Sequence, residues 1–174
     1  MPRLFLALPI GADGRRRLAD FAARELVAGL RLVPEDNLHV TLVFCGSVPE
    51  ARVPEAAAAL AVVPAAFTFT LAPVRLRAYG SAVGVALAAD DATVALQAAL
   101  AGRLAGAGLA RDERRPWSPH VTLARAPGRR RPRVPDVAPP AEVLRGSEVL
   151  LCASVATGRG VRYEAVSSSS SSAT

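Results

Sequence analysis

The sequence predicts one α+β domain made of two lobes, and three observations support this prediction. The chain has 174 residues, 51% of them hydrophobic, which is enough to bury one sizeable core. Segments that alternate like half-buried strands are interspersed with segments of helical periodicity. The tetrapeptide His-Val-Thr-Leu occurs twice, at 39–42 and 120–123. We therefore expect a single domain over residues 1–166, with antiparallel-rich sheets lining a central cleft and helices on the outside.

The first half of the chain reads as strand, helix, strand and a second helix. Residues 3–10 (RLFLALPI) form a short apolar run, typical of a buried strand. Across residues 12–29, apolar side chains recur at helical spacing with arginines on the other face. Residues 37–46 (NLHVTLVFCG) are predicted as a strand by their β-branched content and alternation. The alanine-rich residues 55–62 favour a helix.

The second half begins with two strands and a helix. Residues 67–74 (FTFTLAPV) alternate strictly, and residues 82–89 (AVGVALAA) are rich in small and β-branched side chains. Either Asp90 or Asp91 can cap the helix that follows, which is expected to reach Gly106. The order strand, helix, second tetrapeptide therefore resembles that of the first half.

The remainder of the chain is predicted to close the fold. After the strand around the second tetrapeptide, an arginine- and proline-rich loop covers residues 126–142. Two strands are expected within residues 147–155 and 161–166. The serine-rich residues 167–174 are of low complexity and are expected to be a disordered tail.

Composition restricts the classes of partner and of site. The net charge of +6 and the isoelectric point near 10.8 fit an anionic partner, since a positive surface potential attracts phosphates. All 21 basic residues are arginine, however, and a genome's nucleotide bias explains that equally well. Cys45 and Cys152 lie far apart and match no disulfide or zinc pattern, so buried thiols are expected. The apolar start of the chain is too short to span a membrane and lacks the order of a signal peptide, which predicts a cytoplasmic protein.

The repeated tetrapeptide places the same two polar groups on one face of each strand. Because side chains alternate along a strand, His39 and Thr41 point one way while Leu38, Val40 and Leu42 point the other. His120 and Thr122 share a face in the same manner. If the lobes face each other, two imidazoles and two hydroxyls converge on one small volume.

Such a group of side chains suits the chemistry of phosphate esters. An imidazole titrates near neutral pH, so one histidine can accept a proton while the other donates one. Threonine hydroxyls can donate to phosphate oxygens and stabilise the charge of the transition state. The chain has no evident cluster of carboxylates or thiolates for a metal, so we expect neither a metal nor a cofactor.

These motifs and their surroundings resemble a known superfamily. Residues 34–48 (PEDNLHVTLVFCGSV), residues 117–127 (WSPHVTLARAP) and the opening strand are similar to the two-histidine (2H) phosphoesterases. The hallmark of that superfamily is a pair of His-x-Thr-x motifs. The branch it resembles is the RNA 2′,3′-cyclic phosphodiesterases, also called 2′-5′ RNA ligase-like proteins. The resemblance runs from Arg3 to Val166.

The resemblance implies a fold, a reaction and a role for each motif residue. The fold would be bilobal, with a pseudo-twofold axis through the cleft. The reaction would be metal-independent hydrolysis of an RNA-terminal 2′,3′-cyclic phosphate to a 2′-phosphate, with reversible 2′-5′ ligation as a related activity. His39 would protonate the leaving oxygen, His120 would accept a proton from water, and Thr41 and Thr122 would hold the phosphate.

Two further residues are candidate RNA contacts. Arg125 can grip a phosphate bidentately, although strict alternation would put it on the face of Val121 and Leu123. Trp117 either stacks on a nucleobase or belongs to the core. The run at 129–133 (RRRPR) is expected to be a solvated loop rather than an RNA track.

Two alternatives to this reading of a monomeric RNA-end hydrolase stay open. The substrate of the same site can instead be a cyclic phosphate on a small nucleotide or on ADP-ribose. The chain can also be a non-catalytic basic RNA-binding module, whose affinity would fall steeply with salt. The paired histidines argue against the second, because phosphate binding alone is better served by arginine.

Overall fold

The computed structural model describes residues 1–26, 29–110, 116–158 and 160–172, and it confirms the predicted α+β class. The strands and helices follow one another in the order anticipated, with two additional short strands. In chain order they are β1 (Arg3–Pro9), α1 (Ala12–Glu25), β2 (Arg31–Leu32), β3 (His39–Ser47), α2 (Val53–Ala57), β4 (Phe69–Tyr79), β5 (Ala82–Ala89), α3 (Asp91–Gly106), β6 (His120–Arg125), β7 (Leu144–Gly146), β8 (Leu150–Thr157) and β9 (Gly160–Ser168).

All strands of the described residues belong to one antiparallel sheet. Its order is β7-β4-β5-β6-β3-β1-β8-β9, and β2 adds to the side of β6. The two strands that carry the tetrapeptides, β6 and β3, are therefore the central neighbours, with three strands beyond each of them. They meet at a single register pair, Val40 with Val121. The sheet thus divides into two halves related by a pseudo-twofold axis between β3 and β6.

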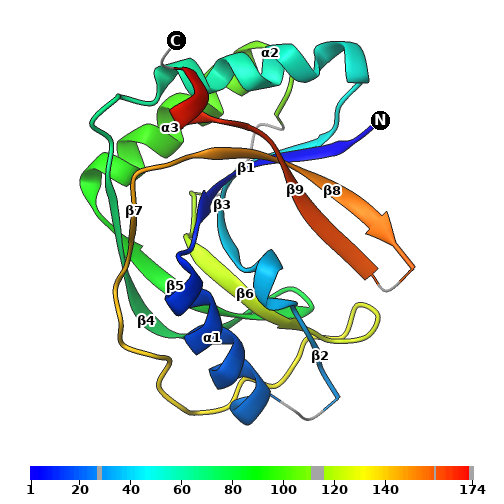
Figure 1. The fold of residues 1–174 in the computed structure, drawn as a ribbon. Helices are drawn as coiled ribbons and strands as arrows, with labels where there is room; N and C mark the ends of the chain where they lie inside the picture. The colour runs from blue at the N-terminus through cyan, green and yellow to red at the C-terminus, as the bar shows by residue number, and fades with distance from the viewer. Residues whose placement is uncertain (27–28, 111–115, 159, 173–174) are drawn as a thin grey trace.

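The helices cross from one half to the other. Each half runs strand, helix, tetrapeptide strand, so α1 follows β1 and α3 follows β5. Yet α1 packs against β6, and α3 packs against β3. Figure 1 accordingly shows α1 at the end of the molecule that holds β4, β5 and β6, while α3 and α2 lie at the opposite end. The chain must fold as one unit because each half covers the other's central strand.

Alternation along the strands separates the core from the site. On β1, the side chains of Leu4, Leu6 and Leu8 are fully buried in the main hydrophobic cluster beneath the helices. The intervening Phe5 and Ala7 belong to a second cluster on the other face of the sheet. That second face is the one on which the polar tetrapeptide side chains gather.

Several predicted boundaries differ from the observed ones. Helix α1 ends at Glu25; the expected extension toward residue 29 includes residues 27–28, which lie outside the described residues. The predicted helix at 55–62 is divided into α2 and a 3₁₀ segment, Ala58–Val62. Strand β4 runs five residues past the predicted end at 74.

The serine-rich end is a further correction. β9 continues through Ser167 and Ser168, which pair with Leu151 and Leu150 of β8, and Ser169–Ser172 form a 3₁₀ turn. Ser169 also donates its backbone N–H to the Val149 carbonyl. The strand therefore extends into the predicted tail, because backbone pairing with β8 does not depend on side-chain complexity. Residues 173–174 of the predicted tail lie outside the described residues.

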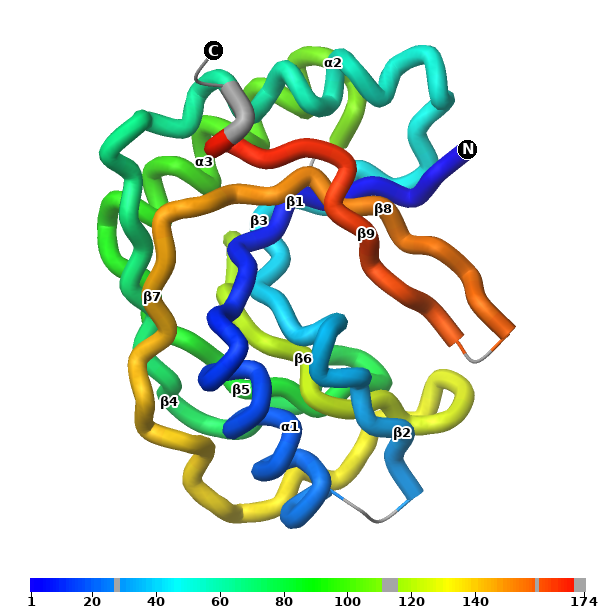
Figure 2. Tube along the Cα trace, in the orientation of Figure 1, coloured from blue at the N-terminus to red at the C-terminus, as the bar shows by residue number. Residues whose placement is uncertain are grey.

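The arginine- and proline-rich segment is a loop, as predicted. In Figure 2 it runs from the end of β6 around the lower end of the molecule, past α1, to reach β7. No helix of the described residues has the length and apolar character needed to cross a membrane.

Candidate active site

The two tetrapeptides meet in a pocket of about 170 Å³ above the join of β3 and β6. Its lining includes His39 and Thr41 from β3, and His120 and Thr122 from β6. Their neighbours on the opposite face, among them Val40, Leu42, Val121 and Leu123, are buried in the core. The convergence of two imidazoles and two hydroxyls expected from the sequence is therefore present in the fold.

A β-bulge falls on the last residue of each tetrapeptide. On β3, Thr41 and Val43 face consecutive residues of β1, which leaves Leu42 without a partner. On β6, Leu123 is skipped in the pairing with β5 in the same way. A bulge of this kind adds one residue to a strand and re-aims the side chains beyond it. Both bulges lie three residues after the histidine, so the local geometry follows the pseudo-twofold axis.

The bulge on β6 brings Arg125 to the site. Strict alternation predicts this side chain on the face of Val121 and Leu123, but the inserted residue returns it to the face of the histidines. Arg125 accordingly lines the pocket, where its positive charge acts on both imidazoles. The bulge thus places Arg125 beside the motif residues, where alternation alone does not put it, and its contact with RNA stays a prediction.

The backbone fixes the tautomer of both histidines. Nδ1 of His39 lies 2.7 Å from the Asn37 carbonyl oxygen, and Nδ1 of His120 lies 2.8 Å from the Ser118 carbonyl oxygen. A carbonyl oxygen can only accept, so Nδ1 carries the proton in each ring. Each Nε2 is therefore the atom left for chemistry. In His39 this atom lies 3.0 Å from the Thr41 hydroxyl oxygen.

Both imidazoles favour the neutral form in the unliganded protein. Burial lowers the pKa of His39 below 6.5, the Asn37 carbonyl opposes this, and the charges of His120 and Arg125 lower it further. Burial also lowers the pKa of His120, against the Ser118 carbonyl and together with Arg125. An anionic ligand between them would raise both values, since it favours the protonated rings.

Aromatic rings support the two histidines differently. The ring of His39 packs 4.9 Å from that of Phe5 and edge-on to Tyr163 at 5.0 Å. The ring of His120 instead stacks flat on Tyr79, with 3.9 Å between centroids. The pseudo-twofold symmetry of the pocket thus holds for the motif residues but not for the aromatic rings around them.

Asn37 connects the start of β3 to β9. Its side-chain amide donates to the Val161 carbonyl at 2.6 Å and accepts from the Tyr163 backbone N–H at 3.1 Å, while its own carbonyl holds His39. Four residues around the histidines were not predicted from the sequence: Asn37, Tyr79, Phe5 and Tyr163. A signal for Asn37 was present, since a residue two before a strand histidine can offer its carbonyl to Nδ1, as Ser118 does in the second motif.

Trp117 is both a core and a surface residue. It is half-buried against the hydrophobic cluster, and its indole N–H donates to the Thr41 carbonyl at 2.9 Å. One part of its ring lines a larger groove of about 1050 Å³ that also includes Thr41, Phe44 and His120. Trp117 is therefore partly a core residue, and its stacking on a nucleobase stays a prediction.

The described residues contain no group of three or more His, Cys, Asp and Glu side chains arranged to hold a metal ion. Cys45 and Cys152 are both buried as free thiols, and burial raises the pKa of each to about 11.

Comparison of the sequence with known families identifies one match. The model of the 2′-5′ RNA ligase superfamily matches residues 15–146, a range that contains both tetrapeptides. Among characterised proteins, the RNA 2′,3′-cyclic phosphodiesterase of Methanocaldococcus jannaschii is 38% identical over 53 residues. That alignment covers 30% of this chain and 31% of the relative's length.

Solved structures share the fold over nearly the whole chain. E. coli LigT complexed with 3′-AMP has a TM-score of 0.80 and 26% identity, and 97% of each chain is covered. A crystal structure described as a phosphoesterase has a TM-score of 0.80 and 25% identity over 96% of each chain. LigT complexed with NADP⁺ is also similar, with a TM-score of 0.78, 25% identity, and 96% and 95% of the two chains covered.

Proposed function

This chain belongs to the 2′-5′ RNA ligase superfamily of 2H phosphoesterases, and from that premise we propose that it hydrolyses an RNA-terminal 2′,3′-cyclic phosphate to a 2′-phosphate. The observation that carries the proposal is the pocket in which two Nε2 atoms of fixed tautomer stand beside two hydroxyls and an arginine. The similar phosphodiesterase of M. jannaschii supports the same reaction.

Hydrolysis begins with the removal of a proton from water. Neutral His120 accepts this proton at Nε2, and the water oxygen forms a bond to phosphorus. The Ser118 carbonyl, which accepts from Nδ1, holds the ring in the required tautomer and stabilises the imidazolium that results. The stacked Tyr79 ring fixes the plane in which Nε2 points.

The bond from phosphorus to the 3′ oxygen then breaks. Protonated His39 gives its Nε2 proton to this oxygen, so the products are a 3′-hydroxyl and a 2′-phosphate. His39 ends neutral and His120 protonated, and exchange with solvent restores both. The direction of transfer between the two histidines follows the family resemblance.

The remaining polar groups bind the phosphate. Thr41 and Thr122 donate to non-bridging oxygens, and Arg125 opposes the charge that grows in the transition state. The contact between Thr41 and His39 fits this sequence of events. When His39 is protonated, its Nε2–H donates to the Thr41 oxygen, which leaves the hydroxyl proton free for the phosphate.

The same groups would also serve the proposed 2′-5′ ligation. If the 5′-hydroxyl of a second RNA strand replaces water, His120 accepts its proton and the 5′ oxygen attacks phosphorus. Departure of the 3′ oxygen then leaves a 2′-5′ phosphodiester. No residue beyond those used for hydrolysis is needed.

A small-nucleotide cyclic phosphate is the second candidate substrate. The similarity to LigT, whose structure is known with 3′-AMP, supports it, and the pocket around the motif residues is small. Side-by-side turnover of a cyclic mononucleotide, an ADP-ribose cyclic phosphate and an RNA end separates the candidates.

The test is incubation with an oligoribonucleotide that ends in a 2′,3′-cyclic phosphate, with a chelator present and the product resolved as 2′- or 3′-phosphate. We expect a 2′-phosphate from the natural protein and none from His39→Ala or His120→Ala. Full activity in either variant, once circular dichroism establishes that it is folded, would contradict the proposal. Salt-sensitive RNA binding without turnover would favour a binding module instead.

A further inference from the structure

The larger groove is continuous with the site but extends beyond it. Thr41, Phe44 and His120 line both the small pocket and the groove of about 1050 Å³. Pockets for small ligands measure about 300–1,000 Å³, so the groove alone is at the upper end of this range. A ligand that placed one end against the histidines would therefore have room for a long remainder.

The charge of the groove is positive. Its lining includes the exposed guanidinium groups of Arg77, Arg129 and Arg131, and none of its described lining residues is acidic. Within the part of the chain that the structure describes, these three arginines form no ion pair. Arg77 lies over the Tyr79 ring at 5.7 Å, which leaves its charge unneutralised. Cations without an acidic partner are free to neutralise an anionic ligand, in particular one with several phosphates.

Aromatic rings stand among these cations. Phe44 is 38% exposed on the side of β3, and Trp117 lines the groove together with it. The indole of Trp117 is held in place by its bond to the Thr41 carbonyl, so the ring is ordered without a ligand. Grooves that combine arginines with fixed rings are typical of proteins that bind single-stranded nucleic acid.

One wall of the groove leaves room for a bulky ligand. The face of α3 that lines it carries Ala101, Gly102 and Ala105. A Cβ added to Gly102 would meet nothing within 4 Å, so this wall is not packed against the rest of the protein. The neighbouring Gln97 is fixed by its bond to the Leu42 carbonyl, which ties α3 to the tetrapeptide strand.

We propose that this groove binds the single-stranded RNA that precedes the cyclic phosphate, so that the protein prefers an oligoribonucleotide to a mononucleoside 2′,3′-cyclic phosphate. The inference rests on the proposed function, in which the cyclic end occupies the motif pocket. The strand leaves the pocket through its 5′ oxygen, passes Phe44 and Trp117, and places its phosphates near Arg77, Arg129 and Arg131.

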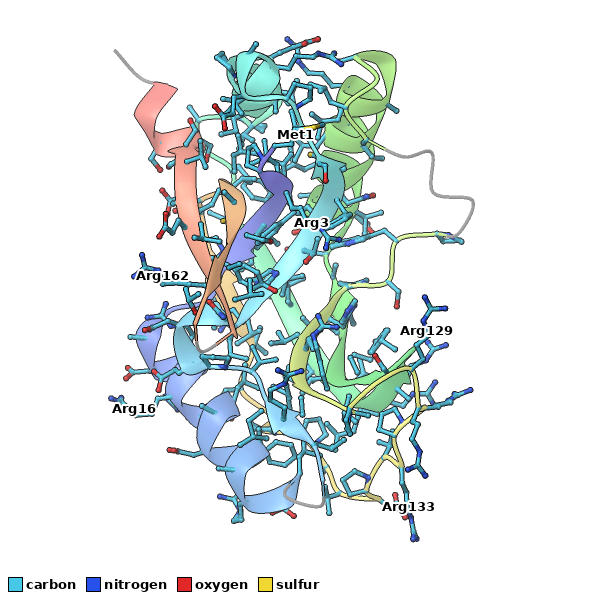
Figure 3. The ribbon with its side chains drawn as sticks, turned by 90° about the vertical axis from the view of Figure 1, so that its right-hand side faces the viewer. Met1, Arg3, Arg16, Arg129, Arg133 and Arg162 are labelled. Atoms are coloured by element: carbon cyan, nitrogen blue, oxygen red, sulfur yellow. The ribbon has the colours of Figure 1, made fainter. Side chains whose placement is uncertain are left out.

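The loop that supplies two of these cations also supplies the control. Arg130 and Arg133 belong to the same loop and carry the same charge, but they do not line the groove. In Figure 3, Arg129 lies at about the height of β6, whereas Arg133 lies at the lower end of the molecule. Replacement of either pair lowers the net charge of the protein by the same amount. Only replacement of Arg129 and Arg131 removes positive charge from the lining of the groove.

The first experiment compares kcat/KM for adenosine 2′,3′-cyclic phosphate and for an oligoadenylate with the same end. We expect the oligomer to be preferred. In the double variant Arg129→Gln, Arg131→Gln, kcat/KM for the oligomer falls roughly tenfold. The slope of log kcat/KM for the oligomer against log salt concentration becomes shallower by about 0.7 for each lost phosphate contact. Turnover of the mononucleoside, and both activities of Arg130→Gln, Arg133→Gln, stay within about twofold. Equal losses in the two double variants, or no preference for the oligomer, would overturn the proposal.

A steric variant tests the groove without a change in charge. Ala105→Phe fills the groove and is expected to lower oligomer turnover while sparing the mononucleoside. Ala99→Phe adds the same ring to an exposed position of α3 outside the groove and is expected to spare both. Equal effects of the two substitutions would count against the groove.

A measurement of RNA binding without catalysis distinguishes a failure of the groove from a failure of the proposed function. Fluorescence anisotropy with an oligoadenylate that ends in a 3′-hydroxyl measures the groove without any reaction. Weaker binding in the Arg129 and Arg131 variant alone would support the groove even if no cyclic phosphate were hydrolysed. Unchanged binding in that variant would overturn the groove even if hydrolysis were normal.

Discussion

Phe44 and Arg125 occupy equivalent positions on β3 and β6, each five residues after the motif histidine and just beyond a bulge. Both side chains line the motif pocket, so the pseudo-twofold axis relates an aromatic ring to a cation. The difference makes the two ends of the site chemically distinct. The β6 side of the pocket thus carries a positive charge, and the β3 side carries an aromatic ring.

Replacement of Arg125 is expected to weaken catalysis and to shift its pH dependence. Hydrogen bonds to charged groups contribute about 1.5–3 kcal/mol, so Arg125→Gln should lower kcat/KM roughly 10- to 100-fold. The loss of its positive charge also raises the pKa of both histidines. Arg31, which pairs with Arg125 in the sheet but does not line the pocket, provides the control as Arg31→Gln. A pH profile that does not move in Arg125→Gln would contradict the electrostatic role.

The natural protein should show a bell-shaped profile of kcat/KM with its maximum on the acidic side of pH 6.5. His120 must be neutral to accept a proton, and its lowered pKa places the acidic limb below 6.5. His39 must be protonated to donate, and its lowered pKa places the alkaline limb below 6.5 as well. In kcat the alkaline limb should lie higher, because bound phosphate stabilises protonated His39. Initial rates between pH 4.5 and 9 test this, and a plateau of kcat/KM above pH 7.5 would be incompatible with it.

Removal of the Asn37 side chain should affect both stability and catalysis. Asn37→Ala deletes the two hydrogen bonds to β9 and leaves the Val161 carbonyl and the Tyr163 N–H without their partner. A hydrogen bond of this kind contributes about 0.5–1.5 kcal/mol, so the loss of two should lower the free energy of unfolding that urea denaturation measures. The backbone carbonyl that holds His39 remains in this variant but loses its side-chain anchor to β9, and Tyr163 packs on the His39 ring, so kcat should fall with little change in KM. Unaltered kcat in a destabilised variant would restrict Asn37 to a structural role.

A methyl group at Gly84 should disturb the second motif. Gly84 pairs with Thr122 beside the bulge, and an added Cβ would lie 2.6 Å from the Val121 carbonyl oxygen. This backbone atom must shift, so Gly84→Ala is expected to lower stability by about 1–3 kcal/mol and to reduce turnover. Gly102→Ala is the matched control, since its Cβ meets open space in α3 and should stabilise the helix by about 0.5–1 kcal/mol. Equal stability of the two variants would contradict the close approach.

Local patterns in the sequence were sufficient for most elements of the fold. The strand at 82–89 and the helix from Asp91 to Gly106 have the predicted bounds, since strand alternation and the cap at Asp90 are encoded nearby. The side-chain oxygen of Asp90 accepts from the Thr93 N–H as such a cap should. The gathering of the motif side chains likewise follows from alternation, once the two strands are neighbours.

Features that depend on a partner strand were not predictable in this way. Leu42 and Leu123 look like ordinary core residues, and only the pairing with β1 and β5 makes them bulges. The orientation of Arg125 depends on that pairing, so alternation alone puts it on the wrong face. The strand at Ser167 and Ser168 exists because β8 offers an edge, although its own sequence carries no strand signal.

The crossing of α1 and α3 has a consequence for the origin of the chain. Each half contributes one histidine–threonine pair, but the long helix that packs on its central strand comes from the other half. A protein of half this length would leave that strand uncovered unless a second copy supplied the helix. If the chain arose by gene duplication, its ancestor was therefore a dimer with exchanged helices, and the reacting phosphate was bound at the interface of two identical subunits.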